Sequence, residues 1–403
     1  MHRHSHATRT NPTRTGPGRT HPGRTHPGRT LRSLGVAGVA IALALPASAA
    51  TAAPADTGSA PGASTAAART TGWAAAATRA PAGDSGLYGN ADPAYDGVYR
   101  QSWAILGLRS VGRTVPAKAV GWLTGQQCAN GGFQSYRADT GAACATSNPA
   151  QFTGPDSNST ALAAMALRSV GKRSQANKAI AYLKTLQNGN GGFAYYVGGD
   201  SDANSTGLAL AALRGMGANG SRIAKATGWL KSVQLRCGAP AANRGLVPFQ
   251  AGGPANYLAS AQSAIGLTTT LPAKVRATKA HSLRCSGGTQ TGAVSTRDAL
   301  LWGSDRALKA GGGAVPSQFG SGKDVSATAQ MAIALGSSRQ YGATVASAVK
   351  VLKRSASSYT NASGAADPAA LGTLLVVSAV TAKTTPTAFG GVNLVKELQR
   401  TLN

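Results

Sequence analysis

The chain carries a helical alternation of apolar and polar positions that repeats along much of its length. Residues 102–112, 159–171 and 205–217 each place Leu and Ala at helical spacing and stop at a glycine, the residue expected at a left-handed helix cap. Their last residues read LGLRSVG, MALRSVG and AALRGMG. The pattern therefore predicts three equivalent helices and indicates an internal repeat.

A second predicted helix follows each of these. The second helices open with Pro or Ser, as helix starts should, and cover residues 116–127, 174–187 and 221–234. Three weaker pairs follow, with first helices near 257–267, 324–335 and 368–380 and second helices near 295–309 (or 273–283), 341–355 and 392–402. One hairpin cannot bury both its faces, so stacked hairpins continue until they close or are capped. Six hairpins predict an all-α, double-layered barrel with the first helices inside and no strands beyond loop ladders.

The second helices end in a regular phrase of glutamine, glycine and an aromatic residue. The complete copies are Leu123-x3-Gln127-x3-Gly131-x-Phe133 and Leu183-x3-Gln187-x3-Gly191-x-Phe193, and a third has Gln234 and Gly238, with Phe249 as the replacement aromatic. The glutamine is placed to satisfy free helix-end carbonyls or to reach a neighbouring helix start, and the glycines allow a sharp turn. The aromatic side chains are expected in the core between hairpins.

This phrase resembles the Gln-Trp repeat of squalene and oxidosqualene cyclases, with Phe in place of Trp. The chain is also similar to the β subunits of protein prenyltransferases and to cobalamin carriers of the intrinsic-factor type. The resemblance covers roughly residues 95–400 and is strongest over the first three hairpins. It implies an alpha/alpha toroid, and it makes cyclisation, prenyl transfer and ligand binding the functions to weigh.

A second phrase, Asp-x-Asn-Ser-Thr, opens two of the first helices at Asp156 and Asp202. Its structural interpretation is capping, because Asp or Ser accepts hydrogen bonds from free amides and complements the helix dipole. The resemblance implies a second role, since squalene-hopene-type cyclases have Asp-x-Asp-Asp-Thr there and protonate substrate with the middle Asp. Here that position is Asn158 or Asn204, and an amide is no strong general acid. Capping is favoured, with Asp200 and Asp202 as weak catalytic candidates in a shifted register.

Two other kinds of active site lack support in the sequence. Prenyltransferases of this superfamily hold zinc with Asp, Cys and His, but His281 is the only histidine after residue 49 and no matching pattern surrounds it. A glycosidase needs two carboxylates at a cavity. The aspartates that can face a cavity mouth are Asp156, Asp200, Asp202, Asp298, Asp324 and Asp367, and nothing in the sequence selects a pair. No metal or cofactor is predicted.

The remaining hypothesis is a non-catalytic binding protein, expected to be a monomer. Tyr136, Tyr195 and Tyr196 follow the Gly-Gly-Phe turns, where their rings can stack on a sugar or another flat ring. The predicted binding residues for a small molecule or an envelope glycan are these tyrosines with Asp156, Asn158, Asp202 and Asn204. The resemblance to cobalamin carriers makes cobalamin one candidate ligand. A divergent cyclase or a polysaccharide-active enzyme is the alternative.

The N-terminal region reads as a targeting segment. Residues 34–45 are an apolar run that precedes a small-x-small site at 47–49. The run is shorter than the ~20 residues of a membrane helix, so a signal peptide is predicted within residues 1–49. Residues 50–84, rich in Ala, Thr, Gly, Ser and Pro, predict a flexible linker, and the toroid is assigned to residues 85–403. The mature protein is therefore expected to be secreted or on the cell surface, and its composition is typical of a GC-rich bacterium.

Charge adds a third candidate function. The chain has 40 Lys and Arg against 13 Asp and Glu, and residues 1–49 hold seven of the arginines, so the remainder carries 33 − 13 = +20. Such a surface favours anionic partners. A structural surface protein that binds an anionic envelope polymer is thus an alternative. No sequence motif indicates specific recognition of nucleic acid, and no span long enough to cross a membrane follows the signal segment.

Four cysteines remain, at Cys128, Cys144, Cys237 and Cys285. In an exported protein an even count suggests two disulfides, for which three connectivities are available. Proximity along the chain favours Cys128–Cys144 and Cys237–Cys285.

Overall fold

The computed structural model describes residues 85–403, apart from 218–219, 280, 319, 363 and 383. The predicted signal peptide within residues 1–49 and the predicted linker at 50–84 lie outside the described residues. None of the described helices is both long and apolar enough to cross a membrane.

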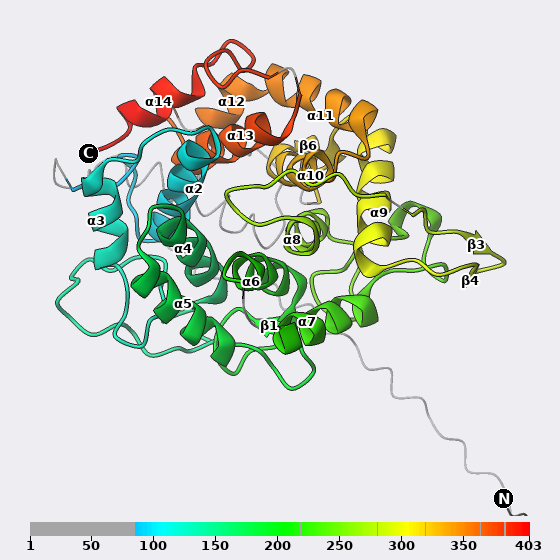
Figure 1. Cartoon of the computed structure of the whole chain (residues 1–403), viewed down its shortest axis with the longest axis horizontal. Helices are drawn as coiled ribbons and strands as arrows, with labels where there is room; N and C mark the ends of the chain where they lie inside the picture. Colours follow the sequence, from blue (N-terminus) through cyan, green and yellow to red (C-terminus); the bar gives the residue numbers. More distant parts are fainter. Residues whose placement is uncertain (1–84, 218–219, 280, 319, 363, 383) are drawn as a thin grey trace, which may run out of the picture. The chain divides into compact units, whose positions relative to one another are not determined.

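Six helices form an inner ring (Figure 1). They are α2 (Gly97–Ser110), α4 (Ser157–Ser169), α6 (Ala203–Gly215), α8 (Tyr257–Thr268), α10 (Val325–Ser338) and α13 (Pro368–Val380). Each packs against the next in this order, and α13 packs against α2, so the ring is closed. Because each inner helix has a neighbour on both sides and an outer layer behind it, these helices are buried nearly all round.

A second helix follows each inner helix and lies outside the ring (Figure 1). These outer helices are α3 (Ala117–Gly125), α5 (Arg173–Thr185), α7 (Gly220–Val233), α9 (Thr296–Ala310), α11 (Gly342–Arg354) and α14 (Leu394–Arg400). They are apolar on one side only: α5 buries Ala176, Ala179, Ile180 and Leu183, which share a face. The closed double layer of helical hairpins confirms the predicted all-α toroid.

Short elements complete the described chain. They are α12 (Ala356–Thr360), the 3-10 helix η1 (Ala241–Asn243), and the two-residue antiparallel pairs β1 (Phe193–Ala194) with β2 (Ser201–Asp202), β3 (Cys285–Ser286) with β4 (Thr289–Gln290), and β5 (Val315–Pro316) with β6 (Lys323–Asp324). The strands are loop ladders, as predicted. Helix α2 starts at Gly97, earlier than the predicted residue 102.

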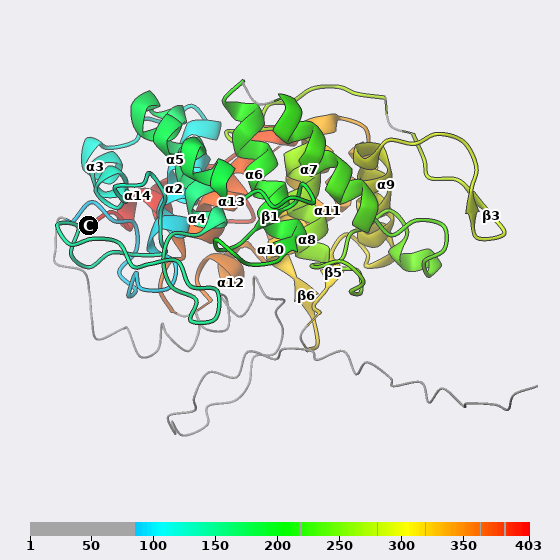
Figure 2. The ribbon, with the colours of Figure 1, turned by 90° about the horizontal axis from the view of Figure 1, so that it is seen from below.

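The long connection between α8 and α9 decides one open alternative. Helix α9 confirms a second helix near residues 295–309, and 273–283 is wrong as a helix. Arg276 and Thr278 there donate their N–H groups to the carbonyls of Ser337 and Ser338, at the end of α10. This segment therefore crosses the end of the ring where the inner helices finish (Figure 2). We call that end the base, and the end where the inner helices begin the mouth.

Glycines allow neighbouring inner helices to touch backbone to backbone. A Cβ atom added to Gly107 of α2 would lie 2.6 Å from the Cα of Gly372 of α13. A Cβ added to Gly207 of α6 would lie 2.5 Å from the carbonyl carbon of Gln262 of α8. Contacts this short require glycine, and they keep the ring narrow.

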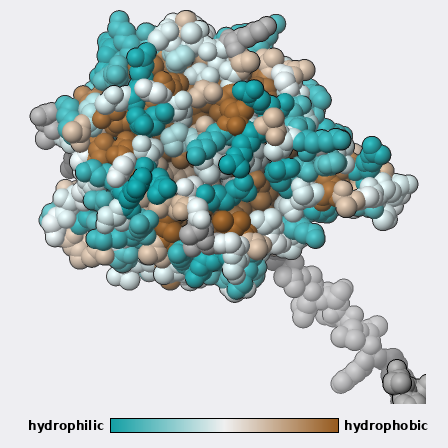
Figure 3. All heavy atoms as spheres, viewed as in Figure 1, coloured by the Kyte–Doolittle hydropathy of each residue, from teal (hydrophilic) through white to brown (hydrophobic). Residues whose placement is uncertain are grey.

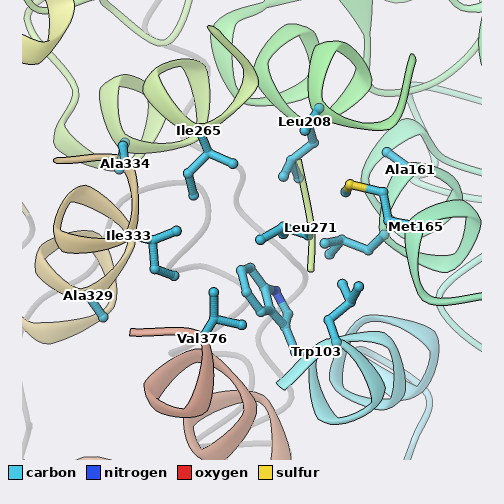
Figure 4. Packing of buried hydrophobic residues seen from close by; sticks show 14 of the residues in the cluster. Trp103, Ala161, Met165, Leu208, Ile265, Leu271, Ala329, Ile333, Ala334 and Val376 are labelled. Carbon is cyan, nitrogen blue, oxygen red and sulfur yellow. The ribbon is translucent and has the colours of Figure 1, made fainter. Parts of the chain in front are cut away.

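The axis of the ring is filled by apolar side chains (Figure 4). Trp103, Met165, Leu208, Ile265, Ile333 and Val376 converge there from the six inner helices, and Leu271 enters from the connection after α8. All are buried; the most exposed of them, Leu271, is only 4% exposed. Along the described inner helices, the part of the ring nearer the base is therefore a packed core rather than an open channel.

Both favoured disulfides are present. Cys128–Cys144 closes a loop between the first two hairpins, and Cys237–Cys285 joins the segment after α7 to the β3–β4 ladder. Buried Arg137 supports the first loop by donating to the carbonyls of Gln127 and Thr140 at 3.0 and 2.7 Å.

Candidate functional site

The repeat glutamines fasten each loop to the next outer helix. The Nε2 atom of Gln127 donates to the carbonyls of Gly131 and Gln175, both at 2.9 Å. Gln187 makes the same pair of bonds, to Gly191 at 2.9 Å and Arg222 at 3.0 Å. One amide thus ties its own turn to the start of the following outer helix, so these glutamines are occupied by structural bonds.

The repeat glycines and aromatics are structural as well. Gly131 and Gly191 have φ angles of +91° and +95°, and a Cβ on either would collide with a backbone carbonyl of the neighbouring outer helix, from Lys178 or Lys225. Phe133 and Phe193 are fully buried. The phrase is therefore a joint between hairpins.

The third copy of the phrase differs from the prediction. Gln234 donates to the carbonyls of Gly245 and Thr296, at 2.9 and 3.0 Å, so Gly245 rather than Gly238 is the repeat glycine. Gly245 also has the positive φ angle, +90°. Val247 takes the aromatic position, and the assignment of Phe249 to it is wrong. The error arises because the spacing from glutamine to glycine is 245 − 234 = 11 here and 131 − 127 = 4 in the first copy, so an insertion that includes η1 separates the two residues.

A hydroxyl bond that the sequence reasoning missed recurs at four of the joints. The N–H groups of Phe133, Phe193, Val247 and Val315 donate to the hydroxyls of Thr160, Thr206, Ser260 and Thr328, respectively, at 2.9 to 3.1 Å. Each hydroxyl lies four residues after the residue that caps its inner helix, namely Asp156, Asp202, Asn256 or Asp324. The signal in the sequence was an Asp or Asn that is followed, four residues later, by a Ser or Thr.

Asp156 and Asp202 lie at the mouth as buried helix caps. Each accepts a hydrogen bond at 2.7 Å from a backbone amide, that of Ser159 or Ser205, and Asp202 also accepts from the Ser205 hydroxyl. Burial raises the pKa of Asp156 from 3.8 to about 6 and that of Asp202 to about 7, against the lowering effect of these bonds. Both carboxyls therefore titrate near neutrality.

Aromatic side chains gather around Asp156. Tyr195 hydrogen-bonds its carboxylate, which partly offsets the effect of burial on the Asp156 pKa. The Tyr195 and Tyr196 rings meet edge to face at 4.6 Å, and the Tyr196 hydroxyl donates to the carbonyl of Phe152 at 2.8 Å. Phe152 is 48% exposed and has φ +53°, a strained backbone for a bulky residue. Tyr136 is apart from this group, stacked on Trp122 of α3 at 6.4 Å.

Polar side chains form a ring one helical turn above the apolar axis. Residues three or four apart share a helix face, so each inner helix places a polar residue directly on the mouth side of an axial one shown in Figure 4. We call this set the mouth ring: Tyr99, Asn158, Asn204, Gln262, Gln330 and Thr373. The predicted Asn158 and Asn204 belong to it, and sequence reasoning missed the other members. Their signal was a lone polar residue in an Ala- and Leu-rich inner helix.

Two amides of the mouth ring have unused acceptors. Asn204 donates from Nδ2 to Oε1 of Gln262 at 3.1 Å, but its own Oδ1 has no partner. Oε1 of Gln330 also has none. The two residues are 6% and 1% exposed, and a buried acceptor without a donor is costly. Both oxygens can accept a hydrogen bond, but each has less than 1 Å² exposed, so neighbouring side chains must move before a bound group can donate to them.

The other candidate aspartates lie at different places in the fold. Asp200 is exposed, whereas Asp324 and Asp367 cap α10 and α13. Asp298 is wrong as a mouth residue, because it lies in the first turn of the outer helix α9 and pairs with Arg297 at 2.8 Å. Among the described residues, no group of three or more His, Cys, Asp or Glu side chains is arranged to hold a metal ion.

Comparison with known protein families also indicates an alpha-alpha toroid. Residues 90–246 match the family model of the prenyltransferase alpha-alpha toroid domain. This match confirms the resemblance to the terpenoid-cyclase and prenyltransferase toroid superfamily. The match ends at residue 246, just after the irregular third copy of the phrase, which runs from Gln234 to Gly245.

Several solved structures are similar to this chain. A protein from Actinoplanes is 15% identical, with a TM-score of 0.46 over 78% of this chain and 98% of that one. A type II terpene cyclase from Scytonema, solved with geranylgeranyl dihydroxybenzoate, is 12% identical, with a TM-score of 0.44 over 79% and 97%. A glycosidase variant is 12% identical, with a TM-score of 0.45 over 77% and 95%. No protein of curated function matches the sequence.

Proposed function

We propose that the protein is an exported, non-catalytic toroid that binds a hydroxyl-rich ligand, a small molecule or an envelope glycan, at its mouth. The observation that carries this proposal is the pair of buried, unpartnered amide oxygens on Asn204 and Gln330. Both accept hydrogen bonds, so the ligand must donate them, as sugar hydroxyls do. Apolar side chains fill the axis below, which limits the ligand to the mouth.

The aromatic residues at the mouth fit the same ligand class. Tyr195, Tyr196 and Phe152 present ring faces and edges beside the Asp156 cap. Aromatic rings that combine an apolar face with a polar edge suit sugars, whose own faces are apolar and whose edges are polar. Cobalamin stays a candidate ligand through the resemblance to cobalamin carriers.

Export is part of the proposal. Two disulfides in a chain of this size are typical of secreted proteins, because cytosolic thiols are kept reduced. N-terminal sequencing of protein recovered from the culture medium tests it, with a mature start near residue 50 as the expected result. Retention of residues 34–45 in the mature protein would contradict a cleaved signal peptide.

The binding proposal is tested by calorimetry on the full chain. Neutral hexose, hexuronate and N-acetylhexosamine oligosaccharides and cobalamin are the probes. Asn204→Leu and Gln330→Leu are expected to weaken binding at least tenfold, the cost of about one charge-free hydrogen bond or more. Asn177→Leu on the exposed side of α5 is the matched control and should bind like the wild type. Absence of binding to every probe, or equal binding by all variants, would defeat the proposal.

One observation favours an enzyme as the second candidate. Glycoside hydrolysis uses one protonated and one ionised carboxyl, and the raised pKa of Asp202, about 7, keeps a proton available near neutrality. Incubating the same oligosaccharides with the protein and analysing for shortened products tests it. Hydrolysis that disappears in Asp202→Asn while the protein stays folded would replace the binding proposal with catalysis.

A further inference from the structure

The base of the ring carries a charge pattern that the mouth does not use. Helices α2, α4 and α6 each have an arginine in their last turn, namely Arg109, Arg168 and Arg214. The repeated Leu-Arg phrase thus places a guanidinium at the same end of the ring three times. A cation at a helix C-terminus stabilises the helix dipole, which accounts for one arginine per helix.

More basic residues gather at this end than the dipoles require. They lie in the inner-to-outer turns, in the segment that crosses the base, at the start of α9 and at the end of α10: Arg113, Lys172, Arg173, Lys274, Arg276, Lys279, Arg297 and Arg339. We call these residues and the three helix-end arginines the basic face. All of them are exposed except Arg297, which is half-buried.

The charges of the basic face act on one another, and only Arg297 among them has an acidic partner in the described chain. Burial, and then the positive charges of Arg297 and Arg276, lower the pKa of Arg214. Asp298 is the one acidic side chain that we find at this end of the described chain, and it is buried and already paired with Arg297. Most other described acids lie in the loops that lead to the mouth or cap the inner helices there. The ring is therefore electrostatically two-sided.

The basic face lacks the apolar anchors of a bilayer-inserting surface. The large apolar side chains that are well exposed in the described residues are Tyr95, Phe152 and Val197, and all three precede inner helices, on the mouth side. Figure 3 views the opposite end, where hydrophilic side chains spread between small apolar patches. Most of the basic residues are arginines, whose planar guanidinium matches phosphate in a bidentate way.

We propose that the basic face binds a linear polymer of phosphodiesters in the cell envelope. Such a polymer offers an extended row of phosphates to charges that are spread over several helix ends, which a single small anion cannot reach. Bound in this way, the toroid points its mouth away from the polymer. The proposal is independent of the mouth ligand, because the two sites share no residue.

The test measures binding of the full chain to poly(glycerol phosphate) by calorimetry at low ionic strength. The triple variant Arg113→Glu, Arg168→Glu and Arg276→Glu reverses three exposed charges whose side chains make no hydrogen bond to another described residue. We expect at least tenfold weaker binding, and a shallower fall of affinity with salt than in the wild type. The matched control, Lys231→Glu, Lys323→Glu and Arg354→Glu, makes the same change in net charge elsewhere and should bind within twofold of the wild type.

Folding is followed by circular dichroism, and the corresponding triple Arg→Gln variant is used if the Glu variant unfolds. Equal losses in the face and control variants would mean that net charge alone drives binding, and this would overturn the proposal. So would absence of binding to the polymer, or binding only to vesicles of phosphatidylglycerol and phosphatidylcholine. Binding of a sugar at the mouth in the face variant shows that the two functions fail separately.

Discussion

The first two joints of the ring and the next two are built by the same bonds from different residues. At the joints before α4 and α6, Phe133 and Phe193 fill the space and buried aspartates cap the helices. At the joints before α8 and α10, Val247 and Val315 take the place of the aromatics. All four joints share the backbone amide that donates to a hydroxyl, and a glycine pressed against a carbonyl. The architecture is therefore uniform around these joints, whereas the capping residue is a carboxyl before α4, α6 and α10 and the amide of Asn256 before α8.

The largest expected effect is the loss of unfolding free energy when the disulfide of either region is removed. Cys128–Cys144 closes 16 residues in the first region, whereas Cys237–Cys285 closes 48 residues in the second. In the chain-entropy account, the longer loop gains more, about 4 kcal/mol against about 3 kcal/mol. Double Cys→Ala variants of each pair, unfolded in urea, should show this order. A larger loss from the Cys128–Cys144 variant would mean that local packing, supported by Arg137, outweighs loop length.

Glycine substitutions test whether the joints are equivalent. Gly131→Ala and Gly245→Ala combine a positive φ angle with a collision against a carbonyl of a neighbouring helix. Each substitution should therefore lower the free energy of unfolding by about 3 kcal/mol. Gly171→Ala and Gly252→Ala have the positive φ but open space around the new Cβ, and they should lose about 1 kcal/mol. Thermal melts of the four variants compare the regions directly. A small loss at Gly245 and a large one at Gly131 would show that the joints are not alike.

A third effect concerns the buried aspartates and depends on pH. Folding raises the pKa of Asp202 from 3.8 to about 7, so the folded state holds the proton more tightly than the unfolded chain. Its contribution to stability is therefore complete below pH 4 and is lost as pH rises to about 7. Asp202→Asn keeps the cap and removes the buried charge. At pH 8 it should be at least as stable as the wild type, by up to about 1.4 kcal/mol for each pKa unit of the shift.

Urea unfolding of the wild type and Asp202→Asn between pH 4 and 8 measures this difference. The joint before α8 supplies the natural control, because Asn256 caps α8 with the same bond, to the amide of Ala259 at 2.8 Å, and cannot titrate. Asn256→Asp should introduce a new pH dependence there. Identical pH profiles for the wild type and Asp202→Asn would show that the Asp202 carboxyl is not desolvated by folding.

The fold was predictable because the sequence repeats the pattern of one helical hairpin. Glycine-stopped helices, an aromatic-Leu pair and a shared Gln-x3-Gly phrase recur at similar spacing, and each copy reinforces the others. The prediction weakened at Gly238, where an insertion separates Gln234 from its true glycine, Gly245. Spacing alone cannot follow an insertion, whereas the hydrogen bonds of the glutamine do.

The candidate site was less predictable, for a geometric reason. Asp156 and Asp202 stand out because their phrase is repeated, but the mouth ring takes one polar residue from each inner helix. Gln262 and Gln330 lie in inner helices that are apolar nearly all round, so no amphipathic pattern shows which side faces the axis. Only the closure of the ring determines it.

That closure also changes what the ends of the described chain mean. Gly86 donates its N–H to the carbonyl of Asn403, and the Asn403 side chain donates to the carbonyls of Leu87 and Gly89. Since these residues meet side by side, the order in which the hairpins are connected is not what holds them together. A circularly permuted toroid that joins residue 403 to residue 85 and starts at the exposed Lys172 would keep every joint of the ring. The closed set of contacts determines the shape of the toroid, and the point along the chain at which the ring is opened does not.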